Sequence, residues 1–118
     1  RRGRGWGMNR GELWQMALDP AVNEPERLRL VLILSSDAMA VLPLRVVVPL
    51  VEWRESFASA PWMVRIPPVL NSGLNTAMAA DALQVRSVST ARLQTCLGSL
   101  PGRVTDEVAA ALNGITGI

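Results

Sequence analysis

The sequence has no histidine, no lysine and no tyrosine, and it has a single cysteine, Cys96. Without histidine the chain lacks the usual proton carrier at neutral pH and the commonest metal ligand. One cysteine excludes an internal disulfide and a thiolate metal cluster. Cys96 also has no histidine to act as its base, so we expect it to be a small buried apolar residue. Any chemistry must therefore come from arginine, carboxylate and hydroxyl groups, with no metal site and no cofactor.

Long hydrophobic runs are also missing. No stretch of about 18 apolar residues exists, so no membrane-spanning helix and no membrane partner are expected. The charges at Arg1, Arg2 and Arg4 are not followed by an apolar segment, which argues against a secretory signal. These absences predict a cytoplasmic protein.

All twelve basic residues are arginine, against ten acidic ones, giving a net charge of +2. A genome rich in G and C favours arginine codons, which explains the bias without invoking function. Whatever the origin of the bias, it has a physical consequence for anion binding. Each cation is a planar fork that can bind phosphate through two hydrogen bonds.

The chain has 118 residues, of which 49% are hydrophobic, and this suits one domain with a real core. Residues 1–7 differ from the rest because they contain only arginine, glycine and tryptophan. We expect residues 1–8 to form a flexible basic N-terminal extension. A vector remnant, an over-extended gene start or a short basic arm each explains them. Residues 9–118 are predicted to form a single domain.

Short apolar or alternating runs, interrupted by turn residues, predict several strands. Pro49 within one of them suggests an edge or a bulge. Residues 76–88 fit either a helix or a strand, and residues 20–29 form a polar loop. The predicted strands lie at residues 11–17, 30–34, 45–51, 62–66 and 94–97.

The C-terminal segment predicts a helix. Thr105 is the candidate N-cap, Asp106 and Glu107 suit the positive end of the helix, and Gly114 can close it. Apolar residues recur at helical spacing from Val104 onward. Six or seven short strands and this helix predict a mainly β, α+β fold: a small β-barrel with a C-terminal α-helix.

Several short motifs occur in an order that is similar to one known family. They are RGELW at 10–14, RLVLIL at 29–34, PLRVVVPL at 43–50, DALQVRSV at 81–88, and the leucine-rich segment with the final helix at 93–115. Over about residues 9–115 the chain resembles the MazF/PemK family of toxin endoribonucleases.

The resemblance implies an SH3-like β-barrel that works as a homodimer. It implies the toxin of a type II toxin–antitoxin system, an mRNA interferase that cleaves single-stranded RNA at short sequences without metal. It also implies a cognate antitoxin whose extended C-terminal segment fills the RNA groove.

Cleaving RNA through its own 2′-OH requires a base, a cation that stabilises the pentavalent phosphorus, and an acid. Arg29 stands where the family's functional arginine stands, so the resemblance makes it the candidate cation; the alternative is a solvated loop arginine. Gln84 and Arg86 lie in the family's Q-x-R segment as candidate RNA-binding residues, although Arg86 can equally pin two strands. Arg27 is a candidate for phosphate contacts, or a solvated loop charge.

Two departures from the family pattern affect the catalytic interpretation. Family members commonly have threonine or serine where this chain has Val51, and some have an acidic residue where it has Leu83. Asp81 lies two positions before Leu83 and shares its face if the segment is a strand. Asp81 is therefore the candidate base, with a surface aspartate at a strand start as the alternative.

Three further residues are candidates for RNA binding. Ser35 and Ser36 suit neutral contacts to phosphate or base edges, or simply a turn. Trp53 has charged neighbours and suits stacking on a base or contact with the antitoxin.

Two other functions stay open. Val51 and Leu83 favour a catalytically weak relative that binds RNA or antitoxin without cutting. A gyrase-targeting toxin of related fold is only weakly excluded by the sequence.

Overall fold

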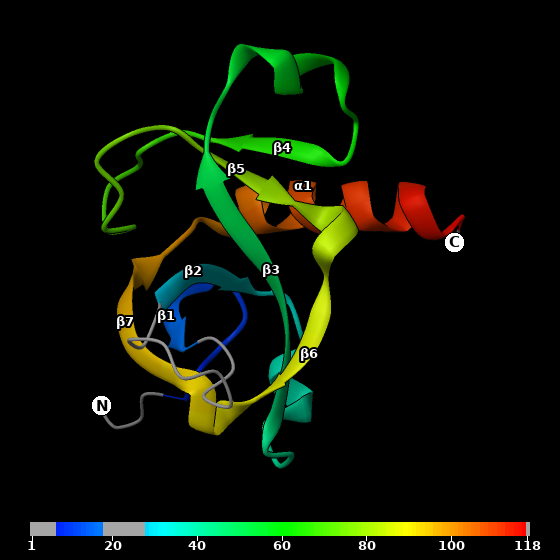
Figure 1. The fold of residues 1–118 in the computed structure, drawn as a ribbon. Helices are drawn as coiled ribbons and strands as arrows, with labels where there is room; N and C mark the ends of the chain where they lie inside the picture. Colours follow the sequence, from blue (N-terminus) through cyan, green and yellow to red (C-terminus); the bar gives the residue numbers. More distant parts are fainter. Residues whose placement is uncertain (1–6, 18–27, 118) are drawn as a thin grey trace, which may run out of the picture.

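The computed structural model describes residues 7–17 and 28–117. Over these residues the chain forms short antiparallel strands, four 3₁₀ turns and one α-helix (Figure 1). The strands are β1 (Glu12–Ala17), β2 (Leu28–Ile33), β3 (Leu44–Glu52), β4 (Met63–Ile66), β5 (Met78–Asp81), β6 (Arg86–Ser89) and β7 (Leu93–Ser99). The turns are η1 (Asp37–Met39), η2 (Glu55–Ser59), η3 (Ala82–Gln84) and η4 (Thr90–Arg92), and the helix is α1 (Gly102–Thr116).

The long strand β3 organises the sheet. The strand order is β4-β5-β3-β2-β1-β7, and β6 joins the first half of β3. One edge of β3 pairs with β6 up to Val47 and with β5 from Leu50 onward. Pro49 lies where β3 changes partner, an interruption that tolerates a residue without an N–H. The sheet curls strongly without closing, so the predicted barrel describes its shape approximately (Figure 1).

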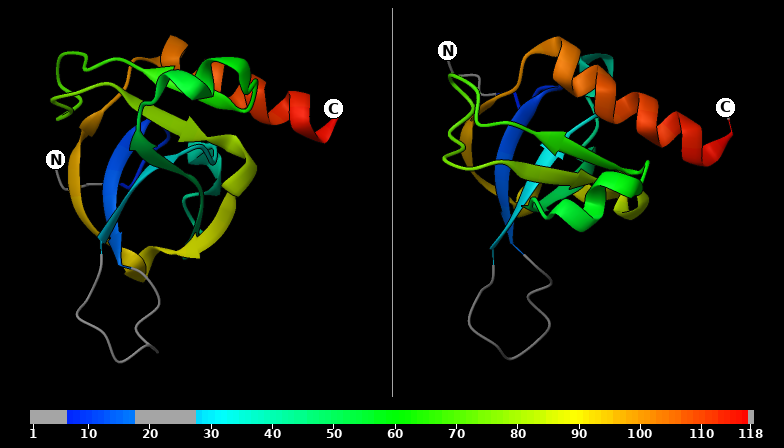
Figure 2. Two further views of the ribbon diagram at one scale, coloured as in Figure 1. Left: turned by 45° about the horizontal axis from the view of Figure 1, so that its top comes forward. Right: turned by 90° about the horizontal axis from the view of Figure 1, so that it is seen from above.

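Alternation along the strands divides the buried residues between the two faces of the sheet. Leu13, Leu32 and Val48 are register partners on the face that packs against Val104 and Val108 of α1. Figure 2 shows α1 lying along one side of the curled sheet. The opposite face has its own apolar cluster: Trp14, Met16, Val31, Ile33, Val47, Val88 and Leu93.

The strands predicted from the sequence at 11–17, 30–34, 45–51, 62–66 and 94–97 each overlap an observed strand, and the α+β class is confirmed. The segment 76–88, left between helix and strand, contains neither alone. It forms β5, the 3₁₀ turn η3 and then β6.

The predicted start of the helix at Thr105 is wrong. The helix begins at Gly102 with Pro101 at the cap, and the Thr105 hydroxyl bonds back to the Pro101 carbonyl at 3.4 Å. Proline suits a helix start because its φ is already close to helical. The helix also continues past Gly114 and ends at Thr116, followed by Gly117 as its C-cap with a φ of 77°. No helix within the described ranges is long and apolar enough to cross a membrane.

The start of the described chain is tied to the sheet by a buried arginine. Arg45 is 7% exposed, and its guanidinium donates to the carbonyls of Gly7 at 3.3 Å and Met8 at 3.0 Å. It also donates to the carbonyls of Leu42 and Leu44, each at 2.8 Å. Of the predicted extension 1–8, residues 1–6 lie outside the described residues, while Gly7 and Met8 are docked on Arg45.

Candidate functional site

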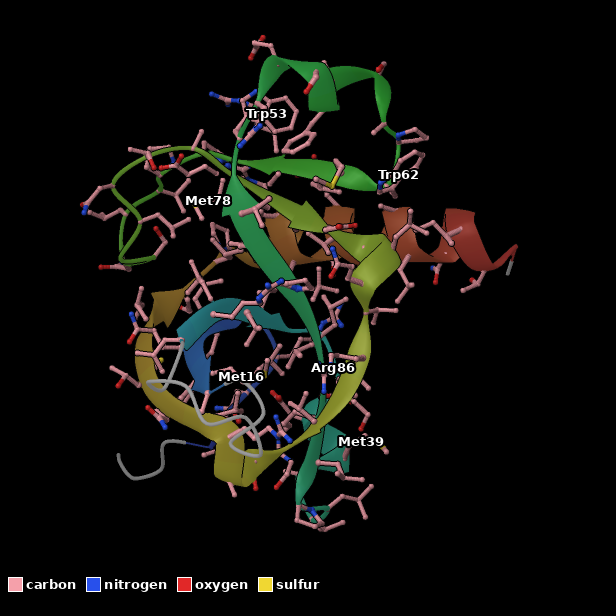
Figure 3. All side chains as sticks on the ribbon, viewed as in Figure 1. Met16, Met39, Trp53, Trp62, Met78 and Arg86 are labelled. Carbon is pink, nitrogen blue, oxygen red and sulfur yellow. The ribbon has the colours of Figure 1, made fainter. Side chains whose placement is uncertain are left out.

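A pocket of about 200 Å³ opens on the sheet face opposite α1. Its floor is apolar, and three polar side chains from η3, β2 and β6 surround it. Figure 3 marks Met16 and Arg86, which bound it from β1 and β6. The lining residues are Met16, Arg29, Val31, Val47, Pro49, Gln84 and Arg86.

Strand register explains why residues so distant in sequence meet here. Met16 pairs with Arg29 across β1 and β2, and Val31 pairs with Pro49 across β2 and β3. Val47 of β3 then pairs with Arg86 of β6. Because register partners share a face, the two arginines stand at opposite ends of one apolar floor.

Both guanidiniums are available to bind an anion. Arg29 is half-buried and Arg86 is exposed. Across residues 7–17 and 28–117 the ion pair found is Arg10–Asp106, at 3.2 Å, so no described carboxylate neutralises either pocket arginine. Two planar cations that face a small pocket and have no carboxylate partner among the described residues suit a phosphate group.

Asp81 is placed differently from the sequence expectation. A strand through residues 81–83 would place Asp81 and Leu83 on one face, but residues 82–84 form η3 and turn the chain away. The Asp81 carboxylate caps η3 by accepting from the Leu83 N–H at 3.1 Å, and it accepts from Gln84 Nε2 at 2.8 Å. Asp81 does not line the pocket, whereas Gln84 does.

The two family departures also lie off the pocket. Val51 pairs with Ala79 of β5, and Leu83 is 53% exposed on η3. Neither side chain lines the pocket floor or its rim.

The candidate serines are engaged in turns. The Ser35 hydroxyl accepts from the Val46 N–H at 3.1 Å, and the Ser36 hydroxyl caps η1 by accepting from the Ala38 N–H at 3.1 Å. Neither lines the pocket. Arg27 lies outside the described residues.

Trp53 belongs to a separate cluster at the end of the molecule shown at the top of Figure 3, away from Met16 and Arg86. Its indole N–H donates to Glu55 at 2.7 Å, and its ring meets Phe57 edge-on at 5.8 Å. The Arg65 guanidinium lies 6.0 Å from the ring centroid. These contacts hold the η2 loop together.

Cys96 is exposed, so the expectation of a buried thiol is wrong. It lies on β7 opposite Trp14 in the register of β1. Partial burial of the sulfur raises the pKa of the Cys96 thiol, and the negative charge of Glu12 raises it further. The described residues contain no group of three or more potential metal ligands.

The apolar floor of the pocket was not foreseen from the sequence. Met16, Val31 and Val47 looked like ordinary core residues, and Pro49 looked like an edge residue. The signal was present in the alternation of β1 and β2, which places Met16 and Val31 on the same face as Arg29 once the pairing is known.

The family described as PemK-like, MazF-like toxin of type II toxin–antitoxin systems matches residues 9–116. The fold is similar to a MazE–MazF crystal structure from Deinococcus radiodurans, with TM-score 0.75 and 24% identity, covering 93% of this chain and 96% of that one. An endoribonuclease from a mycobacterial species aligns with TM-score 0.72 and 20% identity over 93% and 91% of the two chains. The toxin MazF-mt6 of Mycobacterium tuberculosis aligns with TM-score 0.71 and 19% identity over 91% and 97%.

No curated protein matches the chain. The family match covers nearly the whole sequence, and the curled sheet with its C-terminal helix agrees with the MazF structures. The chain belongs to the PemK-like, MazF-like family of toxins of type II toxin–antitoxin systems.

Proposed function

We propose that this toxin is an endoribonuclease that cleaves single-stranded mRNA without a metal ion. The observation that carries the proposal is that Arg29 and Arg86 line the same pocket in a chain of this family. Neither arginine has a carboxylate partner among the described residues. An mRNA substrate also implies that the protein acts in the cytoplasm.

The proposed chemistry takes its nucleophile from the substrate. The RNA 2′-OH loses its proton to a base and attacks the adjacent phosphorus, and the bond to the 5′ oxygen breaks as that oxygen gains a proton. The products are a 2′,3′-cyclic phosphate and a free 5′-OH. DNA lacks the 2′-OH and is not a substrate.

Arg29 is proposed to bind the non-bridging oxygens of the phosphate that is cleaved, and Arg86, exposed at the rim, is proposed to hold the RNA in place. Negative charge grows on these oxygens in the transition state, and fixed cations stabilise it without rearrangement. Arg29 is half-buried, where charge–charge interactions are less screened by water. Because no carboxylate lines the described pocket, we assign neither the base nor the acid to a described side chain.

We also propose a cognate antitoxin as partner. Among the structures with this fold, the Deinococcus one is a MazE–MazF complex and a mycobacterial one holds an endoribonuclease with its cognate antitoxin. Arg29 and Arg86, which have no carboxylate partner in the described part of the chain, give an acidic antitoxin segment a place to bind, and its binding would block RNA.

The proposed homodimer uses a second surface. An apolar groove of about 710 Å³ lies between β4 and α1. Trp62 and Ile115 are partly exposed there, 36% and 39%, beside the small residues Ala110 and Gly114. A two-fold interface places the same patch against itself, and this patch offers both a protruding ring and a small-residue surface to receive it.

Light scattering on the purified toxin tests the dimer. Trp62→Arg should give a monomer that keeps the same circular dichroism spectrum, because Trp62 is already partly exposed. Leu70→Arg, at an 88% exposed site outside the groove, should leave the dimer intact. If the Trp62→Arg variant stays dimeric, the dimer interface does not lie at this groove.

The activity is tested by incubating the protein with mixed RNA in the presence of EDTA. Cuts at defined sequences with cyclic-phosphate ends, lost in Arg29→Ala, support the proposal. Binding of RNA without cutting would favour the catalytically weak relative. Intact RNA together with inhibited gyrase would favour the gyrase-targeting toxin.

A further inference from the structure

Strand β6 has a free edge. One side of β6 pairs with β3, and among residues 7–17 and 28–117 no strand pairs with its other side. Ser87 is exposed and Ser89 is half-buried on this short strand. An unpaired strand edge presents a row of N–H and C=O groups, which the backbone of another extended chain can join as a further strand.

The hydrogen bonds of β3 show which main-chain groups of β6 face this edge. The Val46 carbonyl accepts from the Leu34 N–H at 2.9 Å, so the main chain of Val46 is turned toward the β2 side of β3. Val46 is the register partner of Ser87. In an antiparallel pair only alternate partners exchange hydrogen bonds, so neither Ser87 nor Ser89 bonds to β3. The N–H and C=O groups of these two serines therefore point to the free edge.

One face of β6 offers a positive charge to an added strand. Arg86 and Val88 alternate with the two serines along β6, so an added strand has one face beside Arg86 and the other beside the serines. Arg86 is exposed and has no carboxylate partner among the described residues. An acidic side chain on that face of the added strand can pair with its guanidinium.

The serine face of β6 leaves apolar side chains uncovered. Leu44, the register partner of Ser89, is 45% exposed although it belongs to a strand. The segment just before Leu44 carries three further exposed apolar side chains, Met39, Val41 and Leu42. Because serine is small, a bulky apolar side chain on an added strand can reach past β6 and cover Leu44.

We propose that the free edge of β6 binds an extended segment of the antitoxin as an additional β-strand, in which acidic residues alternate with bulky apolar ones. The inference rests on the cognate antitoxin proposed above as partner. The acidic residues pair with Arg86 at the rim of the pocket, and the apolar residues cover Leu44. A second copy of this chain suits the edge less well, because two Arg86 side chains would then share one interface.

Ser87→Pro tests the backbone pairing, and Ser87→Ala is its matched control. Proline removes the N–H that faces the free edge, without removing a hydrogen bond to β3. Alanine keeps that N–H and removes only the hydroxyl. The probe is a peptide of about eight residues with blocked ends, in which glutamate and leucine alternate. The same peptide with every backbone nitrogen methylated cannot donate to a strand and is the control ligand.

NMR titration measures the affinity of the peptide and the hydrogen exchange of the toxin amides. We expect wild type and Ser87→Ala to bind the peptide equally and Ser87→Pro to bind it about tenfold more weakly, because one hydrogen bond is lost. Leu44→Ser should also weaken binding, whereas Leu70→Ser, at an exposed site in another loop, should not. The peptide should slow exchange of the Ser87 and Ser89 amides, and the methylated peptide should not.

Equal affinities of wild type and Ser87→Pro, or unchanged exchange of the two serine amides in wild type, would overturn the inference. The exchange result decides even if Ser87→Pro does not fold. A dimer that becomes a monomer in Ser87→Pro would assign the edge to a second copy and also overturn it.

The proposed nuclease is judged separately, because Ser87 does not line the pocket. RNA cleavage by a wild type that binds no peptide at β6 leaves the nuclease function intact and removes the inference. Conversely, slowed exchange at β6 in a protein that cuts no RNA supports the inference and removes the nuclease function.

Discussion

Arg29 of β2 and Arg86 of β6 line one pocket although their strands do not pair with each other. Strand β3 lies between them and supplies Val47 and Pro49 to the floor. The separation of the two cations is therefore set by backbone register rather than by contact between the side chains. A site fixed in this way needs little rearrangement to stabilise a growing negative charge.

Replacing Arg29 should abolish most of the cleavage. Loss of one fixed donor to a developing oxyanion lowers the rate by about 100-fold or more, so Arg29→Ala should lower kcat by at least that factor. Arg29→Lys keeps the positive charge but loses the planar guanidinium, so its kcat should lie between those of wild type and Arg29→Ala. Arg103→Ala, on the exposed start of α1, is the control. A similar loss of kcat in Arg29→Ala and Arg103→Ala would contradict a catalytic role for Arg29.

Replacing Arg86 should act mainly on binding, because its side chain is exposed at the rim. The affinity for single-stranded RNA should become less sensitive to salt, and the slope of log K against log salt should fall by about 0.7 for one lost phosphate contact. Titrations of Arg86→Ala over a range of salt concentrations measure this slope. An unchanged slope would place Arg86 outside the phosphate contacts.

Arg45 should be a stability residue rather than a functional one. Its buried guanidinium satisfies the carbonyls of Gly7, Met8, Leu42 and Leu44. Arg45→Met leaves these acceptors without that donor and should lower the free energy of unfolding by about 2 kcal/mol or more. Urea denaturation measures the change, with Arg54→Met as an exposed control. Equal stabilities for the two variants would contradict this role.

Gly98 should resist substitution because β7 passes directly over the 71–73 turn. A Cβ at Gly98 would lie 2.8 Å from the backbone carbon and 2.9 Å from the backbone oxygen of Ser72. Gly98→Ala should therefore destabilise the fold by about 2 kcal/mol or more, as an overpacked site does. Gly102→Ala, with nothing within 4 Å, should change stability little. Thermal unfolding of the two variants compares them directly.

The Cys96 thiol should alkylate slowly at neutral pH despite its exposure. Its pKa is raised by partial burial and by Glu12, so the reactive thiolate forms only at higher pH. A raised thiol pKa contributes stability that is present below the ordinary thiol pKa and is lost as the pH rises through the folded-state value. Glu12→Gln should speed alkylation by iodoacetamide about twofold at pH 8, whereas Glu52→Gln should not. Equal rates would exclude Glu12 as a cause.

Local patterns in the sequence predicted most of the strands, because alternating and β-branched runs depend only on residues that are adjacent in the sequence. Arg29, Gln84 and Arg86 were indicated by the family resemblance rather than by any local pattern, and all three line the pocket. The helix start was missed because Thr105 resembles a cap, while its hydroxyl in fact bonds back to Pro101 inside the helix.

The rest of the site depends on pairings that the sequence does not display. The floor residues Met16 and Val47 become neighbours of the arginines only through the registers of β1 with β2 and of β3 with β6. The placement of Asp81 failed for a local reason. A single 3₁₀ turn at residues 82–84 breaks the two-residue period on which the same-face argument relied.

The chemistry of the RNA ends tests the proposed cleavage mechanism most directly. Wild type and Arg29→Ala are incubated with single-stranded RNA in EDTA, and the fragments are analysed by mass spectrometry. The proposed mechanism predicts 2′,3′-cyclic phosphate and 5′-OH ends from wild type, no cutting of the matching DNA, and at least about 100-fold less product from Arg29→Ala. Intact RNA with wild type, or equal cutting by Arg29→Ala, would contradict it.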